Sequence, residues 1–178
     1  MLIKRIAAPM LAIIALSGCG HYYYDRGPSD NNLIEVSDDT VQQLLSNLKL
    51  PFPKGSLLMI NPLVNVENLS QTTAFGRIVS DQLASAFHRA GYRIMRMDLP
   101  SEMLNKDEIG TLSLTDKAKE ILQASGVNAL IVGTFASGKQ HAYISLRMVD
   151  MASQSVIATA DQSVNMGPDA RALLQTNP

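Results

Sequence analysis

The chain has 178 residues, one cysteine, no tryptophan and a formal net charge of −1 at pH 7. This length suits one domain with a substantial buried core and is short for two. A charge so near zero gives no strong attraction to nucleic acid or anionic lipid. A single cysteine excludes an intramolecular disulfide.

Residues 1–18 have the features of an export signal. Lys4 and Arg5 form a short basic start, and an apolar run over residues 6–16, interrupted only by Pro9, follows. This run is too short for a membrane-spanning helix, which needs roughly 20 apolar residues. Small residues come next, as they do before a signal cleavage site.

The sequence LSGC, which ends at Cys19, resembles the lipobox of bacterial lipoproteins. The resemblance implies cleavage before Cys19, a diacylglycerol on its thiol and an acyl group on the new amino terminus. Each buried methylene contributes about 0.8 kcal/mol to membrane binding, so several acyl chains form a lasting anchor. Gly20 stands where an aspartate would resemble an inner-membrane retention signal, so we expect the outer membrane, facing the periplasm. The alternative is an ordinary secreted protein with a chance cysteine.

Residues 19–38 are predicted to be the lipid anchor and a flexible tether. The stretch GHYYYDRGPSDNN has no apolar periodicity and is rich in turn-forming residues. Its three tyrosines, residues 22–24, either rest at the lipid interface or are solvated. Without Lys4 and Arg5 the mature chain has 13 basic and 16 acidic residues, a charge of about −3.

The pattern over residues 40–48 predicts a short helix with one apolar face. Thr40 and Gln43 have the spacing of a capping box. Asp38 and Asp39 would then precede the helix, where negative charge favours its dipole.

Two strands and the longest helix are predicted next. The apolar run over residues 56–66 suits a central strand, with Pro62 marking a frayed end or a bulge. Residues 73–90 carry a helical apolar stripe that Gly91 ends. Residues 92–99 alternate well enough for a second strand.

The second half changes from helical to strand periodicity. Residues 100–114 are predicted to be a polar connection, either mobile or in contact with a partner. Residues 115–124 predict another helix, and the apolar run 127–135 a third strand. Apolar and polar residues then alternate over residues 142–164, around a turn at 150–154, which predicts antiparallel hairpins.

This order of elements predicts an α/β fold. We expect a two-layer or three-layer sandwich with a mixed sheet, in which parallel crossovers come first and an antiparallel meander last. The domain would span residues 39–166, and residues 167–178 would be a C-terminal tail.

One motif suggests nucleotide binding. Gly133, Gly138 and Lys139 have the G-x-x-x-x-G-K spacing of a phosphate-binding loop. Such a loop leads into a helix and has Ser or Thr after its lysine, whereas Gln140 and strand alternation follow here. We therefore predict a hairpin turn, with Gly138 at a position that tolerates positive φ, and no nucleotide.

Catalytic and metal-binding patterns are also weak. His21, His88 and His141 have no acid or second histidine at a metal-ligand spacing. Cys19 is committed to lipid, and no G-x-S-x-G elbow occurs. We expect no enzyme activity, no cofactor and no metal.

Charged residues on the long helix are the candidates for a partner-binding surface. Arg77 and Asp81 stand four apart, which predicts an exposed ion pair. Arg89, with Arg93 and Arg96, either binds an acidic partner or is solvated. Arg77, Asp81 and Arg89 are the predicted surface.

The stretch over residues 65–94 resembles the FlgO family of outer-membrane lipoproteins. The shared features are an Asn-Leu-Ser turn, a Gly-Arg pair, a Gln-Leu pair and a Gly-Tyr pair, at residues 68–70, 76–77, 82–83 and 91–92. The later ALIVGTF and ISLRMVDMASQSVIATA resemble the second half of the family. The likeness covers residues 39–164. It departs at residues 153–155, where Thr-Gly is expected, and this leaves the turn type there open.

The resemblance implies a non-enzymatic envelope component tied to the flagellum where it crosses the outer membrane. The domain is also similar to curli-export lipoproteins and to the N-terminal part of the Tol translocation protein, which favours partner binding. Its partners would be outer-membrane lipid, through Cys19, and envelope or flagellar basal-body proteins. The alternatives are a lipoprotein that binds a small ligand or cell-wall fragment, which needs a concave pocket, and a hydrolase, which needs two titratable residues that meet in space.

Overall fold

The structure, a computed structural model, describes residues 29–96, 103–106 and 112–175, with the backbone alone for residues 104–106 and 112–114. The predicted signal, Cys19 and most of the tether lie outside these residues. In chain order the described elements are α1 (Leu33–Ser46), β1 (Leu57–Ile60), β2 (Val64–Asn65), α2 (Ala74–Arg89), β3 (Arg93–Arg96), β4 (Leu104–Lys106), β5 (Leu112–Leu114), α3 (Asp116–Ala124), β6 (Ala129–Ser137), β7 (His141–Asp150), β8 (Ser155–Asn165) and α4 (Pro168–Leu174).

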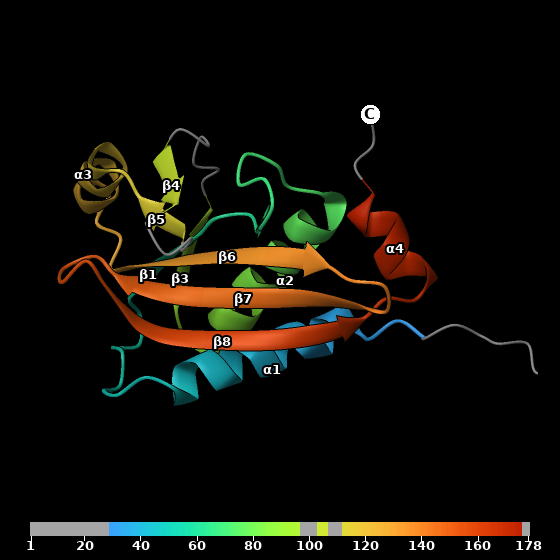
Figure 1. Ribbon diagram of the computed structural model, residues 1–178. Coiled ribbons are helices and arrows are strands. Elements are labelled where there is room, and N and C mark those ends of the chain that lie inside the picture. Colours follow the sequence, from blue (N-terminus) through green and yellow to red (C-terminus); the bar gives the residue numbers. More distant parts are fainter. Residues whose placement is uncertain (1–28, 97–102, 107–111, 176–178) are drawn as a thin grey trace, which may run out of the picture.

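The main sheet is mixed and has the strand order β3-β1-β6-β7-β8 (Figure 1). β1 runs parallel to β3 and to β6, and β2 pairs in parallel with the far half of β6. β6, β7 and β8 follow as antiparallel neighbours. β4 and β5 form a small separate hairpin. The predicted α/β class, with parallel crossovers before an antiparallel meander, is confirmed.

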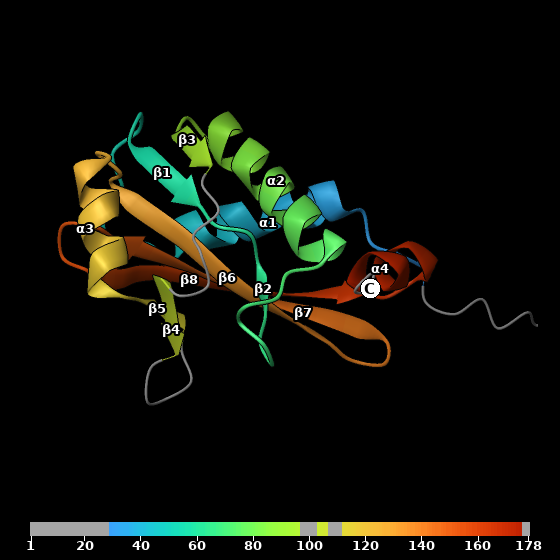
Figure 2. The same ribbon diagram turned by 90° about the horizontal axis from the view of Figure 1, so that it is seen from above.

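Helices cover both faces of the sheet, but unequally. α1 and α2 pack on one face, where their apolar stripes join the inward residues of β1, β6, β7 and β8 in the larger core. α3 covers part of the other face, over a smaller core that includes Leu122, Met59 and Leu130. Figures 1 and 2 show α3 near one end of the sheet and α4 near the other. Because β6 is buried on both faces, its sequence is a continuous apolar run, whereas β7 alternates.

The single strand predicted over residues 56–66 is two strands, β1 and β2, separated around Pro62, and α2 compensates for the break. Leu63 lies between β1 and β2 and is 1% exposed. Its backbone N–H donates to Ser80 Oγ at 2.9 Å, and its carbonyl accepts from Thr72 Oγ1 at 2.6 Å. A Cβ on Gly76 would lie 2.4 Å from that carbonyl. Glycine therefore lets the first turn of α2 approach the strand closely.

Three consecutive side chains, Asp30, Asn31 and Asn32, attach the start of the described chain to three elements. Asn32 caps α1, accepting a 3.1 Å bond from the N–H of Ile34. Asn31 accepts a 2.6 Å bond from the N–H of Asn165, at the end of β8. Asp30 accepts two backbone N–H bonds, of 2.8 and 3.0 Å, from the first turn of α4. We call residues 30–32 the junction.

The structure corrects the predicted start of the first helix. α1 begins at Leu33 and not at Thr40, because Asn32 supplies the cap. Thr40 lies inside the helix, where its hydroxyl donates to the carbonyl of Val36. Asp38 and Asp39 therefore lie on the helix and do not precede it.

Two further segments contain structure that the sequence pattern did not predict. The supposed C-terminal tail holds α4, which begins with proline at its first helical position. The supposed polar connection over residues 100–114 holds β4 and β5; its other residues, apart from Met103, lie outside the described part of the chain.

Candidate binding surfaces

The phosphate-binding spacing belongs to a hairpin, as predicted. Gly133 lies inside β6, and Gly138 lies in the turn to β7, where its N–H donates to the carbonyl of His141 at 2.8 Å. The predicted reason for Gly138 was wrong, because positive φ occurs at other glycines. A Cβ there would instead meet the His141 carbonyl at 3.0 Å. A β-hairpin offers no helix N-terminus to a phosphate.

The histidines do not converge. His88 lies near the end of α2 and His141 at the start of β7, while His21 is outside the described residues. Across residues 29–96, 103–106 and 112–175, no group of three or more His, Cys, Asp or Glu side chains could hold a metal ion.

The predicted partner surface on α2 is built differently from the expectation. Asp81 pairs with Arg96 of β3 and not with Arg77, so the predicted i,i+4 ion pair is wrong. Arg89 pairs with Asp38 of α1. Arg77 is exposed, and none of the ion pairs found among the described residues includes it.

These two ion pairs border a hollow of about 590 Å³ beside α2 and β3. Asp81, His88, Arg89 and Arg96 line it together with a few small or apolar side chains. Both arginines are already neutralised by carboxylates, so the hollow has little net charge to offer an acidic partner. Exposed pairs of this kind are each worth only about 0–1 kcal/mol.

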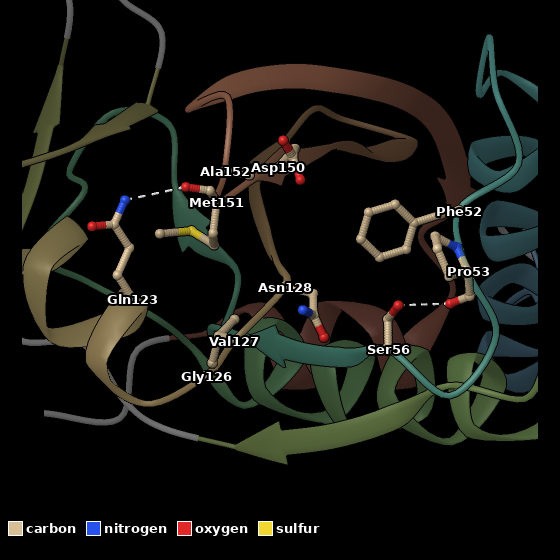
Figure 3. A pocket seen from close by; sticks show the side chains of 10 residues that line it. All are labelled: Phe52, Pro53, Ser56, Gln123, Gly126, Val127, Asn128, Asp150, Met151 and Ala152. Carbon is tan, nitrogen blue, oxygen red and sulfur yellow. Dashed lines mark hydrogen bonds between the residues drawn. The ribbon is translucent and has the colours of Figure 1, made fainter.

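A second surface lies at the α3 end of the sheet and was not predicted. Two hollows, of about 580 and 400 Å³, share Phe52 and Asp150 and form one groove. We call it the end groove, and Figure 3 shows the residues that line its larger hollow. Its lining comes from three separate parts of the chain: residues 48–53 with Ser56, residues 123 and 126–128, and residues 150–152 with 155–157.

Hydrogen bonds hold the floor of the end groove. Asn128 and Leu57 exchange two bonds: the N–H of Leu57 donates to Asn128 Oδ1 at 2.7 Å, and the N–H of Asn128 donates to the Leu57 carbonyl at 2.8 Å. The N–H of Met151 donates to the Asn128 carbonyl at 3.0 Å. Gln123 Nε2 donates to the Met151 carbonyl at 3.2 Å, a bond visible in Figure 3. The three contributing segments are therefore tied together before anything binds.

The wall at Phe52 is held by an aromatic contact. The hydroxyl of Tyr92 donates to the Phe52 carbonyl at 3.3 Å, and the two ring centroids are 6.3 Å apart. Lys54 Nζ lies 4.6 Å from the centre of the Tyr92 ring on its way to the Ala90 carbonyl. This packing fixes residues 52–54, although they are outside regular secondary structure.

Asp150 is the one carboxylate among the residues that line the end groove, and Lys49 is the one cationic residue. The hydroxyl and N–H of Ser153 donate to its Oδ2 at 2.6 and 2.8 Å. These bonds, led by the one from the hydroxyl, lower the pKa of Asp150 below its ordinary value despite an opposing effect of burial. The carboxylate is therefore ionised at neutral pH.

The mixed sheet and its helix layers place the chain in the α/β class. Within the described residues, no helix is long and apolar enough to cross a membrane. The chain belongs to the FlgO protein family, which matches residues 38–169.

Among curated proteins no sequence matches the chain significantly. Among solved structures it is similar to the LpoB C-terminal domain from Salmonella enterica, with a TM-score of 0.56, 13% identity, and coverage of 76% of this chain and 100% of that one. The LpoB C-terminal domain from Escherichia coli gives a TM-score of 0.54 at the same identity and coverage. At this identity the likeness shows a shared fold.

Proposed function

We propose that this protein is an outer-membrane lipoprotein that acts as a non-enzymatic scaffold in envelope assembly, in association with the flagellum. The observation that carries the proposal is one chain that joins a lipobox ending at Cys19 to a FlgO domain over residues 38–169. The lipobox supplies the anchor, and the family supplies the expectation of an assembly role.

The arrangement of the domain suits such a role. The chain leading from Cys19 enters at the junction, beside α4, and the end groove lies at the opposite end of the sheet (Figures 1 and 2). Residues 20–28 can span at most about 30 Å when extended. A domain tethered this way stays close to the membrane and presents its far end to the periplasm.

The chemistry of the described surfaces supports a binding role over catalysis. The acidic and basic side chains that meet there do so as ion pairs: Asp38 with Arg89 and Asp81 with Arg96 join two elements each, and Asp116 with Lys119 lies within α3. The end groove is lined mainly by apolar side chains. Catalysis needs a nucleophile or base in reach of an activating partner.

Binding of a small ligand or cell-wall fragment is the second candidate. The volumes of the end groove fall in the range of ligand pockets, which is roughly 300–1,000 Å³. Such pockets typically bury most of their ligand, whereas this groove is wide and open to solvent. A protein segment suits it better than a small molecule.

In-cell photocrosslinking of the anchored protein tests the scaffold role. A photoreactive amino acid at Val156 samples the end groove, and one at Arg77 samples α2. Flagellar basal-body or ring proteins among the adducts are the expected result. Adducts with a different envelope machine would remove the flagellum from the proposal, and a small cell-wall fragment in place of protein would favour the second candidate.

Cell fractionation tests the anchor separately. Cys19→Ser should abolish acylation and move the protein out of the outer-membrane fraction. Retention of the Cys19→Ser protein in that fraction would contradict a lipid anchor at this residue.

A further inference from the structure

We propose that the end groove binds an extended segment of a partner protein in which apolar side chains flank a lysine or arginine. This inference deepens the proposed scaffold role and rests on it for its biological setting. It is carried by the lining of the groove, the Asp150 carboxylate and the position of the groove relative to the anchor.

The first observation is an exposed apolar pair. Leu50 is 79% exposed and Val156 is 49% exposed, and both line the smaller hollow of the end groove. The other exposed large apolar side chains among the described residues lie elsewhere, at Ile34, Ile78 and Tyr143. Phe52 and Ile157 extend the surface between Leu50 and Val156. Apolar side chains that gather in one open groove give the apolar side chains of a partner a surface to contact.

The second observation is the charge of Asp150. Hydrogen bonds from Ser153 keep this carboxylate ionised, and it lines both hollows. The ion pairs among the described residues join other side chains, so Asp150 has no cationic partner there, although Lys49 lines the same hollow. An ionised carboxylate between apolar walls is complementary to a basic side chain with apolar neighbours.

The third observation is that the groove is formed in advance. Asn128, Met151 and Gln123 connect its segments through backbone and side-chain hydrogen bonds of 2.7–3.2 Å. A groove held in this way loses little conformational freedom on binding, which favours affinity.

The position of the groove favours another protein as the occupant over the ends of this chain. The junction, where residues 1–28 attach, and α4, after which residues 176–178 follow, both lie at the opposite end of the sheet. α1 has 14 residues, so it separates these ends by about 21 Å, and in the proposed lipoprotein the chain at the junction leads away from the groove to Cys19 in the membrane.

Peptide binding to the full-length protein, purified in detergent micelles, tests the proposal. The probe is a short fluorescent peptide in which leucines flank two lysines. One matched peptide has glutamate in place of lysine, and a second has serine in place of leucine. We expect the Leu–Lys peptide to bind about tenfold more tightly than either control, as measured by fluorescence anisotropy.

Two pairs of variants locate the binding site. Val156→Arg should weaken binding of the Leu–Lys peptide about tenfold, whereas Tyr143→Arg, on an exposed side chain outside the groove, should change it less than about twofold. Asp150→Asn keeps an acceptor for Ser153 but removes the charge, so it should reduce the preference for lysine over glutamate. Ser145→Ala, on the same strand but outside the groove, should leave that preference intact.

Several results would overturn the proposal. These are equal binding of the three peptides, or equal effects of Val156→Arg and Tyr143→Arg on variants whose urea midpoints show that they are folded. Self-association in sedimentation runs that Val156→Arg abolishes would identify a second copy as the occupant. The peptide assay depends on neither the lipid anchor nor the flagellum, so its failure would leave the scaffold role to be decided by crosslinking.

Discussion

Replacing Ser80 with alanine should destabilise the protein more than the same change at Ser85. The two serines lie on α2, and each hydroxyl donates to the carbonyl four residues before it, at 2.8 and 3.1 Å. Ser80 also accepts the N–H of Leu63 at 2.9 Å, in a site where it is 2% exposed. Ser85 is exposed.

The magnitude follows from that one additional bond. Leaving the buried N–H of Leu63 without a partner costs about 1–3 kcal/mol. Alanine is a better helix former than serine by about 0.5 kcal/mol, which offsets part of this cost. Ser80→Ala should therefore lower the free energy of unfolding by about 1–2 kcal/mol. Ser85→Ala should leave it unchanged or raise it by up to about 0.5 kcal/mol.

Urea unfolding of the two variants and the parent protein measures the difference. With a slope of about 1–3 kcal/mol per molar urea, the midpoint of Ser80→Ala should fall by roughly 0.3–2 M. If both variants unfold at the midpoint of the parent, Ser80 is not the partner that compensates for the strand break, and the account of α2 given above is wrong.

Three further perturbations test other parts of the structure. Asp30→Ala removes the acceptor for the first turn of α4, which should cost about 1 kcal/mol and speed amide exchange in α4 but not in α2. Ser153→Ala should raise the pKa of Asp150 toward its ordinary value, as followed by NMR titration. A lowered native pKa stabilises the fold at pH values above the unfolded pKa of about 3.9. Ser153→Ala should therefore be less stable than the parent protein at pH 7, and this difference in stability should disappear as the pH falls through the lowered native pKa. Gln154→Gly should raise the free energy of unfolding by about 0.5–1 kcal/mol, because Gln154 has a φ of 55°, which glycine adopts without strain. Thermal unfolding measures this change, and an unchanged melting temperature would show that the turn has no strain to relieve.

The strands could be predicted because their burial is written into their periodicity. β6 is covered on both faces and has a continuous apolar run, while β7 and β8 alternate because their second face is largely open.

The turn between β7 and β8 shows why the expected Thr-Gly mattered. Gln154 adopts the left-handed conformation that glycine would favour there.

The first two turns of α1 were missed because polar residues occupy its buried face. Ser37 and Thr40 are each 1% exposed, and their hydroxyls donate to the carbonyls of Leu33 and Val36, at 2.7 and 2.5 Å. A search for apolar spacing therefore begins only at Val41. A hydroxyl group that donates to a carbonyl of its own helix can be buried like a small apolar group. Where serine and threonine take the buried positions in this way, the spacing of apolar residues no longer shows the helical period.

The binding surfaces were harder to predict because they depend on contacts between distant residues. Helical spacing made Arg77 the natural partner of Asp81, but β3 brings Arg96 to that carboxylate. Residues 50–53, LPFP, follow the predicted first helix and have no periodicity of their own, although they form a wall of the end groove. Their partners in that groove follow about 70 and 100 residues later in the chain. The periodicity of a short segment carries no information on contacts between residues that are far apart in the sequence.

In the proposed scaffold, attachment and recognition are separated along the length of the sheet. At one end, Asp30, Asn31 and Asn32 attach the incoming chain to α4, β8 and α1, so a pull on the tether is shared among three elements. At the other end, the end groove is built from loops that those elements hold in place. A scaffold that connects a membrane to a partner must transmit load without opening its binding surface. Placing the junction and the end groove on opposite ends of one continuous sheet suits that requirement, because β6, β7 and β8 are joined by strand pairing along their length, with one irregularity at Met148 and Val149.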